Sequence, residues 1–570
     1  MLRYILPFIS YFAGIISVCG QTASPLLPHQ IEPPMRIPLL MSGNFGELRK
    51  NHFHSGIDLK TAGVTGQKVY SIDEGYISRI SISPYGYGKA LYIDHPSGIT
   101  TVYGHLNRFT RKLDSLVKAR QYAAESFGIN LTFPAGELPV RRGELIAFSG
   151  NTGSSGGPHL HFEIRDTQTE EILNPLTCFR HQIKDTRTPD IKSLMIYPEG
   201  GIVNGSARKK QIPVTRRSDG TPRIEVPVTA WGKIGIGLKA YDYMDGTTNT
   251  YGIYSIELQV DSQTVFSFKS DRFSFGESRY LNSLIDYEEY RAKRSFFIKS
   301  YIDPGNRLRM CTAPANGPGI LKIDREKEYR CTYILRDAYH NTTTLSFTIL
   351  GVKQPLPPVP GKQQEQLGWD EAHTIRKNDM KLEIPAGALY NDLRFEYKQE
   401  KKEKGQPYYS DIYHIHRPGT PLHLYSELTV RIADDTLRNK SRYYLVKIDK
   451  EETPVTGKYD DGFYTVRIRE FGKYAVRADL TPPSVVPVGA EKWVRNGVIR
   501  YRIRDEESGI RSYRGEIDGR FALFEEDGKS PVISYRLDKE RLERGKKHEL
   551  KLTVTDNCGN IKEVYTSFMW

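Results

Sequence analysis

Short stretches of alternating apolar and polar residues, separated by turns rich in glycine and proline, run through most of the chain. Such alternation is typical of β-strands, in which successive side chains point to opposite faces. Near the N-terminus the pattern predicts strands over residues 69–83, 90–95, 99–103, 145–149 and 159–165. From about residue 186 onward only short β runs follow, so the pattern predicts a mainly β protein.

One segment departs from this alternation. In residues 110–127 apolar side chains such as Leu113 and Val117 recur at helical spacing, and Gly128 ends the pattern. The spacing predicts a helix within an insertion, residues 110–140, that interrupts the first β domain.

Two later regions share a sequence pattern. A Gly-Ile pair leads along a strand to an aspartate in residues 252–261, and the same spacing recurs in residues 509–518. Each copy ends in an Asp-x-x-x-Asn sequence, residues 337–341 and 556–560, which is typical of a turn capped by a side chain. We therefore expect two immunoglobulin-like β-sandwich domains, residues 186–352 and 479–570.

The remaining boundaries follow from proline. Residues 353–362 are rich in proline and predict a stiff, extended linker. Residues 363–478 form a further predicted β domain, and Thr481-Pro482-Pro483 marks its boundary with the last one. The first β domain is expected over residues 35–185.

The N-terminus predicts export. A short basic start, an apolar stretch too short to span a bilayer and small residues before Gln21 are typical of a signal peptide, residues 1–20. Cys19 as a lipoprotein anchor is a second possibility, although the residues before it make a poor lipobox. No later stretch approaches ~20 apolar residues, so we expect no transmembrane span after cleavage and a location in the periplasm, at the cell surface or outside the cell.

Charge and cysteine content narrow the function classes. The formal net charge is +13, which favours an anionic setting such as the polymers of a cell envelope. No basic run interleaved with aromatic residues occurs, so we expect no nucleic-acid partner. None of the five cysteines forms a CxxC pair, which argues against a thiolate metal site; Cys311 and Cys331 could form a disulfide or remain free thiols.

Three glycine-flanked segments hold the candidate chemistry: HFHSGID at residues 52–58, YGHL at 103–106 and GNTGSSGGPHLHFE at 150–163. In a strand, His159 and His161 project from one face about 7 Å apart, so one could bind a metal and the other meet a substrate. His54 and Asp58, on either side of a glycine, add an imidazole and a carboxylate. Together with one imidazole of the third segment they make a three-ligand set that suits a catalytic zinc ion with an open fourth position.

The order HxxxD, YGHL and GxTGxSxGPHLHFE resembles the lysostaphin/LytM-type zinc metallopeptidases, which cut peptide bonds in peptidoglycan. The resemblance covers about residues 40–180. It implies one zinc ion (Zn2+) per chain bound by His54, Asp58 and His161, with His105 and His159 as the catalytic pair. His52 lies outside the pattern and is expected either at the rim or behind the ligands, in support of them.

The resemblance implies an exported zinc metalloendopeptidase that hydrolyses peptidoglycan cross-link peptides for remodelling or lysis of the cell wall. Zinc lowers the pKa of water towards ~7, and one imidazole accepts the proton while the other stabilises the oxyanion. Which of His105 and His159 is the base stays open. The alternatives are a non-hydrolytic module of this fold that binds the wall or activates a hydrolase, and an adhesin-like protein that acts through its β domains.

The insertion is the main departure from the resemblance. It lies between the segments of His105 and His159, so we expect it beside the groove, as a wall, a lid or a structural support. We favour a wall, with Lys112, Lys118 and Arg120 facing an anionic wall polymer.

Overall fold

The computed structural model describes residues 31–315, 317–358 and 365–570. The expected signal peptide with Cys19, and part of the expected linker, lie outside these residues. Most elements of the described residues are antiparallel strands, and only α1 (Arg111–Ala123) is a helix of more than two turns among them. The prediction of a mainly β protein is therefore confirmed.

The first β region, residues 35–185, is built on one large sheet. Strands expected from the alternation form its centre, with Leu160 and Phe162 buried on the face opposite the histidines. The strand order is β1 (Met41–Gly43), β4 (Ile57–Lys60), β13 (His159–Asp166), β8 (Ile99–Gly104), β7 (Lys89–Asp94), β6 (Gly75–Ile82) and β10 (Ile129–Thr132).

A second, smaller sheet completes this region and carries the helix. Its order is β5 (Lys68–Tyr70), β12 (Leu145–Phe148) and β9 (Arg108–Phe109), and α1 follows β9 directly. The helix buries Leu113 and Val117 against the region's core, as its spacing predicts, because an amphipathic helix stabilises itself by covering its apolar stripe.

The second β region, residues 186–352, packs tightly on the first. Its sheet contains β15 (Asp190–Pro198), β20 (Val228–Tyr241), β28 (Thr342–Gly351), β27 (Glu328–Arg336), β21 (Ser255–Val260) and β22 (Gln263–Lys269), in that order. Its short strand β23 (Arg272–Phe273) extends the sheet of the first region through β14 (Ile172–Leu173). Phe273 packs against Phe45 and Phe53 with ring centroids 5.2 and 5.5 Å apart, so the two regions share a core.

The third β region, residues 365–478, is a pair of five-stranded sheets. One contains β30 (His373–Lys377), β31 (Met380–Ile384), β35 (Pro421–Arg431), β39 (Phe463–Glu470) and β38 (Lys458–Asp460). The other contains β33 (Tyr397–Glu400), β34 (Ile412–Ile415), β40 (Gly472–Ala478), β36 (Tyr443–Ile448) and β37 (Glu452–Val455).

The fourth β region, residues 479–570, is a pair of four-stranded sheets, one of which repeats part of the second region. One sheet contains β41 (Ser484–Pro487), β42 (Val498–Arg504), β46 (Val532–Arg536) and β45 (Glu525–Glu526), and the other contains β44 (Arg520–Ala522), β43 (Ile510–Ile517), β47 (Lys547–Asp556) and β48 (Ile561–Met569). The order β44-β43-β47-β48 matches β22-β21-β27-β28. In both, the asparagine of the Asp-x-x-x-Asn corner donates its backbone N–H to the aspartate at 2.8 Å and its side-chain amide at 2.6 to 2.7 Å.

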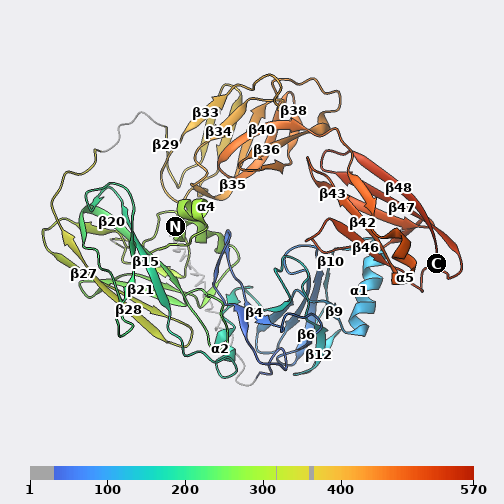
Figure 1. Cartoon of the computed structure of the whole chain (residues 1–570), viewed down its shortest axis with the longest axis horizontal. Helices are drawn as coiled ribbons and strands as arrows, with labels where there is room; N and C mark the ends of the chain where they lie inside the picture. Colours follow the sequence, from blue (N-terminus) through green and yellow to red (C-terminus); the bar gives the residue numbers. More distant parts are fainter. Residues whose placement is uncertain (1–30, 316, 359–364) are drawn as a thin grey trace, which may run out of the picture.

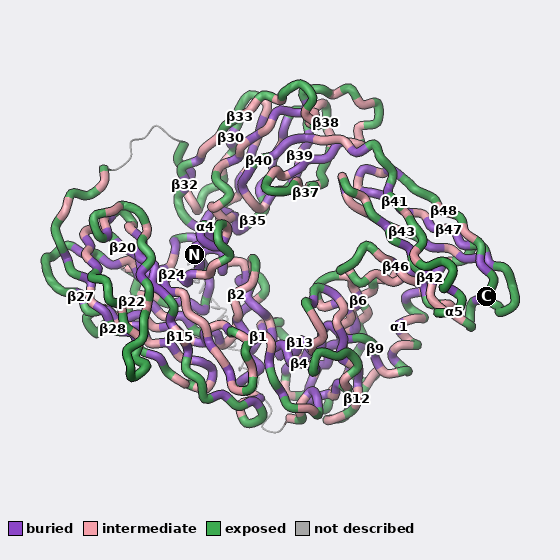
Figure 2. The backbone as a smooth tube through the Cα atoms, in the orientation of Figure 1, coloured by how far each residue is buried: buried purple, intermediate pink, exposed green. Residues whose placement is uncertain are grey.

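The four regions follow one another around a ring, and the fourth returns to the first beside α1 (Figure 1). Lys118 of α1 forms an ion pair with Asp538 at 2.6 Å, and the Arg541 guanidinium lies 3.4 Å from the centre of the Tyr122 ring. Buried positions lie mainly within the strands of each region, and most loops are exposed (Figure 2). The outer face of α1 is therefore a contact surface for the fourth region.

Two further points concern membrane-spanning helices and the cysteines. None of the helices in the described residues combines the length and the apolar composition that a bilayer crossing needs. Cys311 and Cys331 are both buried and free, which is the second of the two alternatives that their positions left open.

Candidate metal centre

Strand register brings the three predicted ligands together. β13 pairs with β4 so that His161 lies directly opposite Asp58, and it pairs with β8 so that His161 lies opposite Gly104, the residue before His105. His54 comes from the loop that precedes β4. Gly56 in that loop is required by close packing, since a Cβ there would lie 2.3 Å from the Phe162 carbonyl oxygen.

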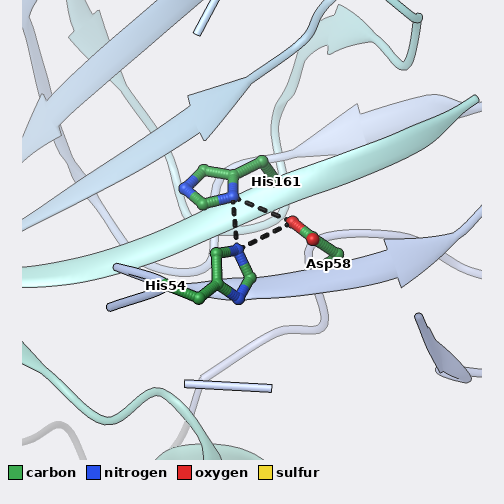
Figure 3. Close-up of side chains that lie close together, drawn as sticks. All are labelled: His54, Asp58 and His161. Carbon is green, nitrogen blue, oxygen red and sulfur yellow. Dashed lines mark hydrogen bonds and ion pairs between the residues drawn. The ribbon is translucent and has the colours of Figure 1, made fainter. Parts of the chain in front are cut away.

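The ligand atoms form a small triangle (Figure 3). His54 Nε2 lies 3.1 Å from His161 Nδ1 and 3.1 Å from Asp58 Oδ1, and His161 Nδ1 lies 2.9 Å from the same oxygen. Ligands about 2.0–2.1 Å from a tetrahedral zinc ion would lie about 3.3 Å apart, so the triangle is close to the size that such an ion requires.

The outer nitrogens of both rings are already engaged. His54 Nδ1 donates to the Asn44 carbonyl oxygen at 2.8 Å, and His161 Nε2 donates to Glu163 Oε1 at 2.8 Å. In neutral rings this leaves a lone pair on each inner nitrogen, and both lone pairs face the Asp58 carboxylate. Three acceptors this close together repel one another unless a cation or a proton lies among them, so the donor set fits a metal ion.

The pKa value of His161 likewise indicates that this site favours a positive charge. Burial lowers the pKa of His161, but hydrogen bonds to Asp58 and Glu163 outweigh it and raise that pKa to about 9. Burial, with smaller contributions from the charges of Arg49 and His161, lowers the pKa of His54 to about 4 against the opposing effect of Asp58. The carboxylates on both sides of His161 thus hold one positive charge in the place where a metal ion would supply it.

His105 and His159 border the triangle without joining it. Their rings lie 4.8 Å apart, centroid to centroid, and His159 Nε2 is 3.3 Å from Asp58 Oδ1. Each ring donates its Nδ1–H to a backbone carbonyl at 2.8 Å, His105 to Thr152 and His159 to Gly157. Nε2 of His105 has no hydrogen-bond partner among the described residues, whereas Nε2 of His159 faces Asp58. Burial and the neighbouring His161 and His159 lower the pKa of His105 to about 3, so this ring is neutral at pH 7.

Sequence reasoning missed the residues that support this site. Glu163 is fully buried, bonds His161 and forms an ion pair with Arg165 at 2.6 Å. Burial raises the pKa of Glu163, but Arg165 and His161 outweigh it and lower that pKa to about 2, which keeps the carboxylate ionised. Tyr87 also donates to Glu163, at 2.6 Å. The signal was available, since residues 161, 163 and 165 share one face of a strand.

Two hollows flank the triangle. One, of about 600 Å³, is lined by first-region residues only, among them Lys60, Pro158 and His159. The other, of about 480 Å³, is lined by first-region residues such as His54 and His161, by residues 275–279 of the second region and by Arg469 of the third. The exposed His52 lies at the rim of this second hollow, the first of its two expected positions.

The insertion takes no part in either hollow. No residue of α1 lines them, and Lys118 forms an ion pair with Asp538 of the fourth region. The expectation that the insertion walls the groove stays a prediction.

Comparison with known proteins matches residues 52–130 to "Peptidase family M23" and residues 364–479 to a "Zu5-like domain". The DD-carboxypeptidase/endopeptidase Mpg of Neisseria meningitidis is 35% identical over 112 residues, or 20% of each chain. The peptidoglycan DD-endopeptidase ShyB of Vibrio cholerae is 34% identical over 111 residues, again 20% of each chain. The lysostaphin catalytic domain of Staphylococcus simulans aligns at 21% identity and a TM-score of 0.19, over 25% of this chain and 92% of that one.

Residues 52–130 thus match the M23 metallopeptidase family, and the resemblance to LytM-type enzymes found in the sequence is confirmed. The match spans about a fifth of the length of these curated relatives.

Proposed function

We propose that the chain is an exported, zinc-dependent endopeptidase that hydrolyses peptide bonds in peptidoglycan cross-links. The observation that carries the proposal is the convergence of His54, Asp58 and His161, with both outer ring nitrogens engaged, beside two further imidazoles that are each held through Nδ1. The names of Mpg and ShyB support the substrate class.

In this proposal the chain divides the chemistry among five side chains. His54, Asp58 and His161 would hold one zinc ion, which, when bound, polarises the scissile carbonyl and makes water more acidic. One of His105 and His159 accepts the proton of the attacking water at Nε2 and passes it to the leaving amine. The other would donate a hydrogen bond to the oxyanion from Nε2, which requires that ring to carry a proton there in addition to the one at Nδ1. Glu163 holds the His161 ring in the orientation that keeps Nδ1 directed inward.

The other parts of the chain receive roles by the same reasoning. Residues 1–20 are proposed to direct export to the periplasm, the cell surface or the outside of the cell. The second and fourth β regions are proposed to be immunoglobulin-like domains, on the strength of their shared strand order and corner. With a net charge of +13, contact with anionic envelope polymers is the partner we expect besides the peptide.

Digestion of purified peptidoglycan, with the products identified by mass, tests this function. The wild-type chain with zinc should release peptide fragments cut at one type of bond, and Asp58→Ala should release none. Absence of products from the zinc-loaded wild type, with retained binding to the wall, would favour the non-hydrolytic alternative.

A further inference from the structure

The hollow beside His54 and His161 is completed by two other parts of the chain. Residues 272–284, which contain β23, the 3-10 turn η1 (Ser278–Tyr280) and α3 (Leu281–Leu284), extend from the second region onto the first. There Ser278 Oγ accepts the Phe53 N–H at 2.9 Å, and the Asn282 amide donates to the Asn51 side chain at 3.0 Å. This anchoring fixes Arg279, one residue past Ser278, at the edge of the metal centre's hollow.

The third region meets the same segment from the other side. The Tyr280 ring stacks on His423 with centroids 4.1 Å apart, and the Tyr390 hydroxyl donates to the Arg279 carbonyl oxygen at 2.9 Å. This contact places Arg469 of β39 on the lining of the hollow together with Arg279.

Both guanidinium groups donate to backbone carbonyl oxygens, and that of Arg469 also lies over the Tyr425 ring. Arg279 donates Nε–H to the Leu422 carbonyl oxygen at 2.9 Å and Nη2–H to that of Arg469 at 3.2 Å. Arg469 donates Nε–H to the His423 carbonyl oxygen at 2.7 Å. Among the described residues neither forms an ion pair with a carboxylate, so two positive charges lie half-buried without an anion.

The neighbouring charged residues form ion pairs, unlike Arg279 and Arg469. Arg49, the third arginine of the hollow, forms an ion pair with Asp58 at 2.7 Å. Glu470, the carboxylate next to Arg469 in sequence, is engaged by Lys447 and Arg291. Burial and the charge of Arg469 lower the pKa of Arg279 below its ordinary value, which is the direction expected for two cations that face each other without a counter-ion.

We propose that Arg279 and Arg469 form a carboxylate-binding subsite that holds an acidic group of the peptide whose scissile bond lies at the metal centre. A carboxylate accepts paired hydrogen bonds from guanidinium groups, and a half-buried position strengthens them. The inference rests on the proposed function and adds to it: the second and third regions would select anionic over amidated peptides on one side of the bond that is cut.

Two synthetic cross-link peptides, identical except that one carries a side-chain carboxylate and the other a carboxamide, test this subsite. The wild type should cleave the carboxylate peptide with a kcat/KM about 10-fold or more above the carboxamide. Arg279→Gln and Arg469→Gln should each lower kcat/KM for the carboxylate peptide by about 10- to 100-fold, mainly through KM, and leave the carboxamide nearly unchanged. Variants that keep the wild-type discrimination would overturn the subsite.

Arg467→Gln is the matched control, since Arg467 lies on the same strand and over the same Tyr425 ring as Arg469, both at 4.9 Å, but does not line the hollow. It should behave as the wild type, and Arg469→Lys should retain part of the preference. Zinc content and thermal unfolding check that each variant folds; equal losses on both peptides would indicate a structural role and contradict the proposal.

Binding separates this inference from the proposed function. If the zinc-loaded wild type cleaves neither peptide, the function has failed, and fluorescence anisotropy with labelled versions of both peptides still decides the subsite. Tighter binding of the carboxylate peptide that disappears in Arg279→Gln and Arg469→Gln would support it, and equal binding of both peptides would overturn it.

Discussion

Two clusters of ionisable side chains in this chain have similar distances between their potential ligand atoms but different hydrogen bonds and surroundings. His54, Asp58 and His161 in the first region, and Asp185, Asp242 and Asp337 where the first region meets the second, each place their potential ligand atoms within 4.8 Å of one another. The first combines two imidazoles with one carboxylate, and both outer nitrogens are held by acceptors.

The second cluster consists of carboxylates only. Asn341 donates to Asp337, whereas Asp242 Oδ1 has no hydrogen-bond partner among the described residues. Burial, with the charges of Asp337 and Asp185, raises the pKa of Asp242 to about 8, so this carboxyl keeps its proton at neutral pH. The comparison teaches that proximity does not make a reactive centre: outer hydrogen bonds that direct lone pairs inward, and hollows that admit a substrate, distinguish the first cluster.

The largest effect should come from removing the one charged ligand. Asp58→Ala is expected to lose most of its zinc and all measurable hydrolysis, because two neutral imidazoles remain. Elemental analysis and peptidoglycan digestion measure both. Asp242→Asn is the matched control and should keep the zinc content and activity of the wild type. Full zinc retention in Asp58→Ala would contradict the ligand assignment.

The next largest loss of activity should come from replacing the imidazoles that border the first cluster. His105→Ala and His159→Ala should each retain zinc but lose about 100-fold or more in rate, the usual scale of a lost general acid or base. His181→Ala, at an exposed position, serves as the control. If His159→Ala loses zinc and His161→Ala keeps it, the two roles are exchanged.

A smaller loss of zinc affinity or activity is expected when Glu163, the hydrogen-bond partner of the ligand His161, is changed. Glu163→Gln should weaken zinc affinity or activity by about 10- to 100-fold, because the ionised partner of His161 is lost. Competition with a chelator measures the affinity. Glu170→Gln is the control, since Glu170 also pairs with Arg165, at 3.4 Å, but is exposed. Equal behaviour of the two variants would show that Glu163 does not orient the ligand.

The smallest effect concerns stability in the second cluster. The pKa of Asp242 is about 8 in the folded state and ~3.9 in the unfolded state, so between these values the folded chain holds a proton that the unfolded chain has released. Stability therefore falls as pH rises through this window. Asp242→Asn should make that slope shallower by up to about 1.4 kcal/mol per pH unit. Thermal unfolding from pH 5 to 8 measures it; identical slopes would mean that Asp242 is ionised in the folded state.

Local features of this chain were open to prediction from sequence. Alternation predicted the strands that become β7, β8 and β13, and the spacing of Leu113 and Val117 predicted α1. The two Asp-x-x-x-Asn corners were equally accessible, since each is closed by hydrogen bonds between residues four apart. Strand periodicity indicated that His159 and His161 share a face, and the resemblance to a known family assigned the metal ligands and the catalytic pair.

The tertiary structure alone decided what surrounds those motifs. Strand register sets Asp58 opposite His161, and this pairing joins residues about a hundred positions apart. The outer face of α1 contacts the fourth region, because the ring of regions closes there. Arg279 and Arg469 belong to different regions, 190 positions apart, and no local pattern relates them. The sequence by itself thus determined the strands, the helix and the reactive side chains, which depend on neighbours along the chain; packing between distant segments decided the ligand geometry, the hollows and their charge.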